Sequence, residues 1–290
     1  MWPNLTMSFP FAVLPIELIL SVIAFAAEHQ PTALALSLVS SWAHRHVEPI
    51  LYHTVCLRSA RALAAFISTL DRKHDGFAER TVKKLCIMAL GPISNIQTVL
   101  SRCTGVTSLA SGFSAPSYIH CVRGQSSTWK EEGGGMLKGL PIAPKEQHLL
   151  FLSCRDGLEM GIISPAVSHL RMQLTPAVTS ESIARLTELR QLTHLALVYN
   201  QVPPGGLNTI KDMLRPVIEG EKLRVLILQV ASGDTHLEEI RRWKRSNVAD
   251  SENLDVIVST SKAPRSFLSE WEESDEFWKR TQDSVGSVVT

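Results

Sequence analysis

The sequence predicts a mixed α/β chain in which an N-terminal helical unit precedes a β/α solenoid. Three observations support this prediction. Residues 14–57 carry ordered helix signals, short apolar strands alternate with helical stretches from residue 80 onward, and several of these strands share one leucine spacing. Successive strand–helix units with similar strand motifs stack into a mostly parallel sheet.

The first predicted helix begins at Pro15. Proline suits the first turn, where its missing N–H is not needed, and Glu17 lies near the positive helix end. The side chains that follow are apolar around most of the helix: Ile16, Leu18, Ile19, Leu20, Val22, Ile23 and Phe25. A helix that is apolar on nearly all sides must be covered on more than one face, so a partner is expected on one of them.

A second apolar helix is expected after Pro31, running through Leu38 to Trp42 with His44 and His46 in its last turn. A strand at residues 54–57 and a helix at residues 59–70 follow. The run of residues 8–27 approaches transmembrane length, but two prolines and Glu17 interrupt it and no basic segment precedes it. No membrane segment is therefore expected.

The N-terminal motifs resemble those of fungal F-box-like proteins. The matching pieces are Leu14-Pro15-x-Glu17-Leu18-Ile19-x-x-Val22-Ile23, then Leu36-Ser37-Leu38-Val39-Ser40, then residues 45–55, and together they span about a fifth of the chain. The resemblance implies a substrate-recognition adaptor that docks a Skp-family protein, and hence a cullin ubiquitin ligase, in the cytoplasm or nucleus. It implies that the docking or F-box core residues are Leu14, Pro15, Leu18, Ile19, Val22, Ile23, Leu38 and Val39.

Seven strands are expected beyond residue 80, near residues 82–87, 106–109, 149–152, 167–174, 192–200, 223–228 and 254–258. Residues 192–200 match the leucine-rich-repeat strand template completely. Leu170, Leu195, Leu226 and Ile257 are separated by steps of 25, 31 and 31 residues, which predicts an irregular leucine-rich-repeat-like solenoid. An ordinary α/β domain is the alternative.

The expected boundaries are an F-box-like helical domain at residues 11–57, a linker helix at 58–80 and a leucine-rich-repeat-like domain at 81–262. Glycine, proline and serine predict a flexible insertion at 111–145. Residues 263–290 are expected to form a capping helix and tail, with Phe267, Leu268, Trp271 and Trp278 on one apolar stripe that shields the last repeat.

Composition and motifs give no sign of catalysis. The net charge of +1 favours neither nucleic acid nor an anionic membrane, and the basic residues at 241–245 are expected to form a solvated helix face. The five cysteines form no C-x-x-C pair, which is typical of free thiols in a reducing compartment. Hydrolase, nucleotide-binding and zinc motifs are absent, so no enzyme activity, cofactor or metal is expected.

Three functions remain open at this level. The first is the adaptor, whose solenoid binds an unknown protein target for ubiquitin-dependent degradation. The second is a generic leucine-rich-repeat-like interaction scaffold with no ubiquitin ligase partner, which is favoured by the departure of Trp42 and His46 from the usual F-box aromatic position. The third, an enzyme on an α/β scaffold, lacks any recognisable site.

Overall fold

The computed structural model describes residues 14–125, 142–199, 206–220, 222–230, 254–260, 267–273 and 277–279, together with 238, 241–242 and 244–245. The chain divides into two compact units, Met1–Val55 and Cys56–Thr290. The division falls inside the strand β1 (Thr54–Leu57). Among the described residues, no helix has both the length and the apolar character needed to cross a membrane.

The first unit contains three helices, α1 (Ile16–Ala27), α2 (Gln30–Ser37) and α3 (Ser41–Leu51). They enclose a small core of Ala27, Ala33 and Val47. Helix α1 begins directly after Pro15, as the sequence predicts.

The predicted second helix is in fact two helices, α2 and α3. The Ser40 hydroxyl accepts a hydrogen bond from the Ala43 amide at 3.1 Å and so starts a new helix at Ser41. Helix α3 also continues through Pro49, although a proline inside a helix removes one i→i−4 hydrogen bond and crowds the preceding turn. His44 and His46 therefore lie in the middle of α3 rather than in a last turn, and the rings of Trp42 and His46 meet edge-on at 4.7 Å.

The second unit is built on an open, parallel eight-stranded sheet. The strands follow one another in chain order: β1, β2 (Lys84–Ile87), β3 (Ser108–Ser111), β4 (Glu146–Leu149), β5 (His169–Leu174), β6 (His194–Tyr199), β7 (Val225–Val230) and β8 (Asp255–Thr260). Each strand from β2 to β7 pairs in parallel with the next. The predicted mixed α/β class with a parallel sheet is thus confirmed.

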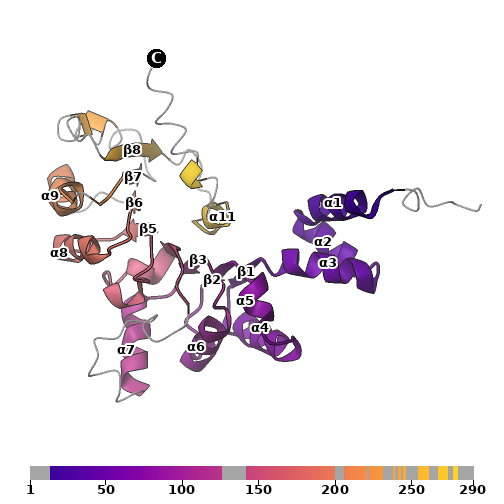
Figure 1. Ribbon diagram of the computed structural model, residues 1–290. Helices are drawn as coiled ribbons and strands as arrows, with labels where there is room; N and C mark the ends of the chain where they lie inside the picture. The colour runs from indigo at the N-terminus through magenta and orange to yellow at the C-terminus, as the bar shows by residue number, and fades with distance from the viewer. Residues whose placement is uncertain are drawn as a thin grey trace, which may run out of the picture. The chain divides into compact units, whose positions relative to one another are not determined.

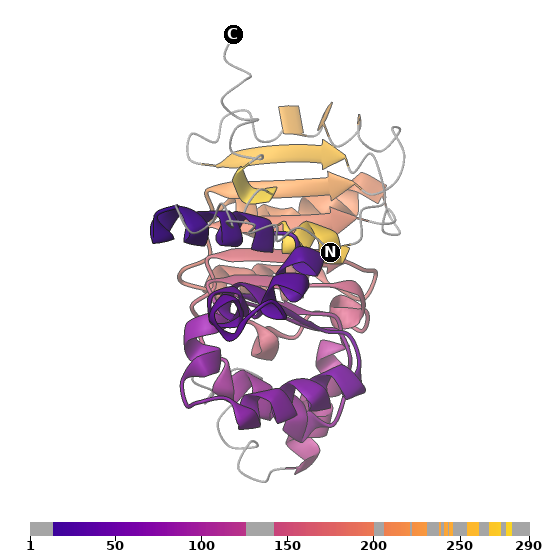
Figure 2. The same cartoon turned by 90° about the vertical axis from the view of Figure 1, so that its right-hand side faces the viewer.

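Helices connect these strands and lie along one face of the sheet (Figure 1). They are α4 (Ala60–Arg72), α5 (Phe77–Thr81), α6 (Ile93–Arg102), α7 (Ala115–Gln125), α8 (Ser180–Ala184) and α9 (Gly206–Ile218), with shorter 3-10 turns η3 (Phe151–Cys154), η4 (Met160–Ile162) and η5 (Arg185–Glu188). Ser59 and Thr179 cap α4 and α8 through their hydroxyls. Figure 2 views the opposite face of the sheet, across which the helix α11 (Phe267–Glu272) lies.

A row of buried side chains crosses the sheet from strand to strand on the side of the connecting helices. In register these are Leu85, Leu109, Gln147, Leu170, Leu195, Leu226 and Val256. The partner of Leu226 is Val256 rather than the predicted Ile257, and the one-residue shift places Ile257 on the opposite face. Gln147 interrupts the apolar row, but its amide bonds the Ile162 carbonyl and accepts from the Ser164 N–H, so its burial is compensated.

Two other local predictions need correction. The strand expected at 149–152 is β4, which ends at Leu149, and a 3-10 turn follows it from Phe151. The insertion at 111–145 was expected to be loop, but Ala115–Gln125 forms α7, whose Tyr118, Ile119 and Val122 are buried. Burial of this apolar spacing outweighs the proline and glycine content there. Residues 126–141 lie outside the described residues.

Replacing Gly105 by alanine should lower the free energy of unfolding sharply. A Cβ atom at Gly105 would lie 1.8 Å from the Glu79 carbonyl oxygen, so the backbone itself would have to move. We expect a loss of about 1–3 kcal/mol or more, the usual cost of overpacking, measured by urea unfolding. Gly220→Ala is the matched control, because its Cβ would approach no atom closer than 3.4 Å; equal losses in the two variants would contradict the prediction.

Candidate functional site

The three N-terminal helices expose an unusual number of large apolar side chains. We call this set the N-terminal apolar surface: Leu14, Ile16, Leu18, Val22, Phe25, Leu34, Leu38, Val39 and Trp42. Leu38 is 87% exposed and Phe25 is 76% exposed. Exposed apolar side chains that share one helix face, as Leu18, Val22 and Phe25 do on α1, mark interaction sites, whereas single exposed apolar residues are ordinary.

Most of the docking residues predicted from the sequence belong to this surface. Exposed are Leu14, Pro15, Leu18, Val22, Leu38 and Val39. The other two, Ile19 and Ile23, are partly buried, and Ile23 packs against the core of the first unit. These two therefore support the helix, while the exposed six are available for contact.

Four members of the surface were not among the predicted docking residues: Ile16, Phe25, Leu34 and Trp42. Phe25 could have been found from helical spacing, because Leu18, Val22 and Phe25 stand at offsets of four and seven residues on one face of α1. Leu34 and Trp42 depend on the break between α2 and α3, which the sequence prediction did not place.

The face of the sheet opposite the connecting helices is rich in polar side chains. In register, one row consists of Lys84, Ser108, Glu146, His169 and His194, and the next consists of Cys86, Ala110, His148, Arg171 and Ala196. Gln229 lies on the same face of β7. We call this set the sheet polar face. Each strand contributes alternate residues to it, because successive side chains point to opposite faces.

The C-terminal segment covers the sheet polar face. Trp271 of α11 packs with Cys86 and Ala110, and its indole donates to the Ser108 hydroxyl at 3.1 Å. The Glu272 carbonyl accepts from the Lys84 ammonium at 3.1 Å. The sequence predicted that this segment would shield the last repeat. Trp278 does pack against Val225, Ile227 and Ile257 of the last two strands, whereas α11 lies over β2 and β3. The reason is that its tryptophan and carboxylate find polar partners on the open face.

Glu270 and Arg171 form the central ion pair of this contact. The Glu270 carboxylate accepts hydrogen bonds from Arg171 and from the Gln229 amide. Arg171 is only 1% exposed, and its guanidinium lies 4.9 Å from the Phe277 ring centre. The buried cation is thus held by the C-terminal segment on two sides.

Trp278 lies over three histidines of the sheet polar face. Its ring meets His169 at 5.1 Å, His194 at 6.0 Å and His148 at 6.4 Å, and its indole donates to Glu146 at 3.1 Å. The His169 and His194 rings stack at 4.1 Å. Burial lowers the pKa of all three histidines, and it lowers the pKa of His194 to about 4.

These histidines should make the chain less stable in mild acid. A histidine in the unfolded chain titrates near pH 6.5, and in the folded chain His194 titrates near 4. Between these values the unfolded state binds more protons, so the free energy of unfolding falls as the pH falls through that window. Burial is the main cause of these lowered pKa values, and neighbouring charges modify them. The Glu146 carboxylate partly offsets the lowering of the His169 pKa, whereas Arg224 lowers the His194 pKa further.

We therefore expect the urea midpoint to be lower at about pH 5 than at about pH 7.5. His194→Phe should reduce this pH dependence, because it keeps an aromatic ring in the stack and removes the titrating nitrogen. The control His120→Gln alters an exposed histidine and should leave the pH dependence unchanged. A wild-type midpoint that does not change with pH would count against a neutral, buried histidine cluster.

The cysteines offer one activated thiol. All five are free, and burial raises the pKa of Cys103 and Cys154 to about 12. The pKa of Cys56 is lowered to about 7, mainly by a hydrogen bond with Cys86 and also by Arg58. The charged groups that shift the pKa of Cys56 are Arg58 and Glu272. Neither group is a histidine, so Cys56 does not have the cysteine–histidine arrangement of nucleophilic catalysis.

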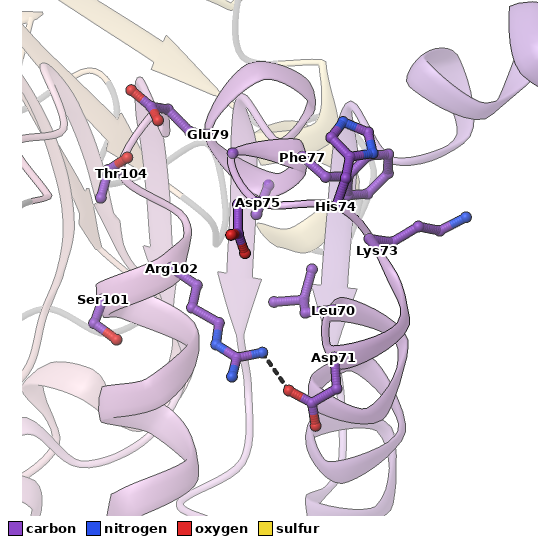
Figure 3. Close-up of a pocket in the computed structure, with 12 residues that line it drawn as sticks. Leu70, Asp71, Lys73, His74, Asp75, Phe77, Glu79, Ser101, Arg102 and Thr104 are labelled. Carbon is purple, nitrogen blue, oxygen red and sulfur yellow. Dashed lines mark hydrogen bonds and ion pairs between the residues drawn. The ribbon is translucent and has the colours of Figure 1, made fainter.

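A polar pocket of about 400 Å³ lies where α4, α5 and α6 meet (Figure 3). Arg102 at the end of α6 pairs with Asp71 of α4 at 2.5 Å, and both side chains are about half exposed. A cation at a helix C-terminus is favoured by the helix dipole, so the pair has a structural explanation. Among the described residues, no group of three or more His, Cys, Asp or Glu side chains has the arrangement of a metal site.

No protein-family model matches the chain, and a search of curated proteins found no match to its sequence.

Proposed function

We propose that the protein is a non-enzymatic substrate-recognition adaptor. In this proposal the N-terminal apolar surface docks a Skp-family protein and through it a cullin ubiquitin ligase, and the second unit binds a target protein. The adaptor performs no covalent step; it raises the local concentration of the target at the ligase.

The observation that carries the proposal is the exposure of the N-terminal apolar surface. Five of the apolar residues that match the F-box motifs are uncovered in and before α1 and at the break between α2 and α3: Leu14, Leu18, Val22, Leu38 and Val39. Fully burying an exposed leucine or valine is worth about 1.5–3 kcal/mol, and Leu38 and Val39 are 87% and 72% exposed, so their burial would contribute to docking a partner.

The second unit supports the target-binding half of the proposal. We infer an irregular leucine-rich-repeat-like solenoid from the chain-order parallel pairing of β1–β8 and the buried row that includes Leu170, Leu195 and Leu226. Such scaffolds bind proteins through extended surfaces made by several repeats. The sheet polar face has this character, since several strands contribute charged and aromatic-ring side chains to it.

Co-expression with a Skp-family protein tests the proposal. The tagged full chain should copurify with the Skp-family protein as a stoichiometric complex through size-exclusion chromatography. The control is the same chain carrying Arg185→Gln, which changes an exposed arginine of the second unit and should copurify equally well. If the folded wild type does not copurify, the adaptor reading fails, and a protein-interaction scaffold without a ligase partner becomes the better description.

A further inference from the structure

The C-terminal segment contacts the sheet polar face as a bound peptide would, through complementary polar groups. Arg171 and Gln229 of the sheet meet Glu270, and Lys84 donates to the Glu272 carbonyl. The segment also buries apolar surface, since Leu268 and Trp271 pack with Cys86, Ala110 and Leu150, and Trp278 packs with Ala196, Val225 and Ile227. Apolar packing alone would not need the ion pair, because buried ion pairs add little stability over apolar replacements. The combination of apolar anchors with directed polar contacts therefore points to recognition as well as packing.

The contact also contains the residue types that anchor protein interfaces. Trp271 is fully buried, and its indole N–H reaches Ser108, while the Trp278 indole reaches Glu146. Tryptophan and arginine in desolvated pockets account for most of the binding energy in many interfaces. Both tryptophans combine ring packing with one directed hydrogen bond, which fixes the position of the segment along the strands.

We propose that the sheet polar face is a recognition surface for acidic–aromatic peptides, and that the described residues 267–273 and 277–279 occupy it as an intramolecular ligand. The matching partner is a protein segment that carries a Glu-Trp pair followed by a pair of aromatic residues, as in Glu270-Trp271 and Phe277-Trp278. The partner binds by displacing the chain's own segment. This inference rests on the proposed function, because it assigns the target-binding surface of the adaptor.

The covalent connection of the segment to the sheet sets how strongly a partner must compete. A short tether gives an effective concentration of about millimolar order. A separate peptide of equal intrinsic affinity then binds only the fraction of molecules whose own segment is released, so its apparent affinity is reduced by that fraction. Weakening the internal contact should therefore strengthen binding of the same peptide added from outside.

The test uses a fluorescein-labelled synthetic peptide of residues 265–280 and the full chain. Glu270→Gln with Trp271→Ala is the release variant, since it removes the central carboxylate and the buried anchor of the internal segment. By fluorescence anisotropy, the release variant should bind the peptide at least about tenfold more tightly than the wild type does. A peptide with both tryptophans changed to alanine should not bind.

Arg171→Gln added to the release variant should weaken peptide binding about tenfold or more, because the carboxylate loses its charged partner. The matched control is Arg185→Gln in the same release variant, which replaces an exposed arginine on η5 and should leave peptide affinity unchanged. A release variant that keeps its fold but does not bind the peptide would overturn the proposal.

Hydrogen exchange of the wild-type chain gives a second test that needs no substitution. The amides of residues 267–273 should exchange by local opening, faster than the amides of β5 to β7. Exchange of both only through global unfolding would mean that the segment is a permanent part of the fold, and would overturn the proposal. A release variant that fails to fold would also overturn the proposal. A concentration-dependent dimer that exchanges residues 267–279 between copies would overturn it as well, because a second copy of the chain would then be the occupant.

These outcomes are separable from those of the adaptor proposal. The peptide experiment uses no residue of the first unit, and the Skp-family copurification uses no residue of the sheet polar face. Loss of copurification with intact peptide binding would leave a peptide-binding scaffold, whereas copurification without peptide binding would require a different target surface.

Discussion

Leu18→Asp together with Val22→Asp is expected to abolish copurification with a Skp-family protein while the chain stays folded. Both side chains are about half exposed, at 52% and 51%, and they stand one helical turn apart on α1. Two carboxylates placed in an apolar contact would have to be desolvated without partners, which costs several kcal/mol and corresponds to a loss of affinity of about 100-fold or more. Size-exclusion chromatography of the co-expressed proteins measures the loss.

The choice of Leu18 and Val22 separates docking from folding. Ile19 is partly buried, so an aspartate there would place part of a charged side chain out of solvent and could destabilise the helix as well as change the surface. The matched control is Ala24→Asp, which adds a carboxylate at another exposed position of α1 outside the N-terminal apolar surface. Retention of the complex by the double variant, with the same circular dichroism as the wild type, would show that this surface does not dock the partner.

Leu195→Ala should cost about 3–5 kcal/mol of unfolding free energy. Leu195 is fully buried in β6, between Leu170 of β5 and Leu226 of β7. These three leucines belong to the buried row that crosses the sheet on the side of the connecting helices, here called the leucine row. Its truncation leaves a cavity that the rigid parallel sheet can close only in part, so both the transfer energy and the cavity energy are lost. Urea unfolding, with the slope checked against the wild type, measures the change.

Leu152→Ala is the matched control for this substitution. Leu152 belongs to the same unit but is 48% exposed, so its truncation should cost less than about 1 kcal/mol. Comparable losses at Leu152 and Leu195 would contradict the assignment of the leucine row as the centre of the core.

Local signals in the sequence were enough to place most of the elements. Pro15 begins α1, Ser59 caps α4, and the leucine spacing around Leu195 marks β6. Each signal acts within a few residues: proline fixes its own backbone, a serine hydroxyl bonds an amide three residues ahead, and alternation sets which face a strand buries.

The exact register between neighbouring strands could not be predicted from the sequence. The sequence aligned Ile257 with Leu226, but the sheet aligns Val256. Both residues are β-branched and apolar, so composition does not distinguish them, and the register is decided by which one the connecting helices bury. The failure at Ala115–Gln125 has the same origin, since α7 is stabilised by contacts that its proline and glycine content does not reveal.

For the candidate sites, the sequence by itself determined the N-terminal apolar helix and the acidic–aromatic C-terminal segment. Only the tertiary structure decided that Leu18 and Val22 are exposed while Ile23 packs inward. It also decided that Trp271 lies over β2 and β3, whereas Trp278 packs against side chains as far as the last strands, β7 and β8. The physical reason is that Arg171, Glu146 and the histidines come from three strands, β4 to β6, and become a surface only when parallel pairing aligns these strands. Their charges are compensated by residues about a hundred positions away, such as Glu270, and no local pattern encodes that contact.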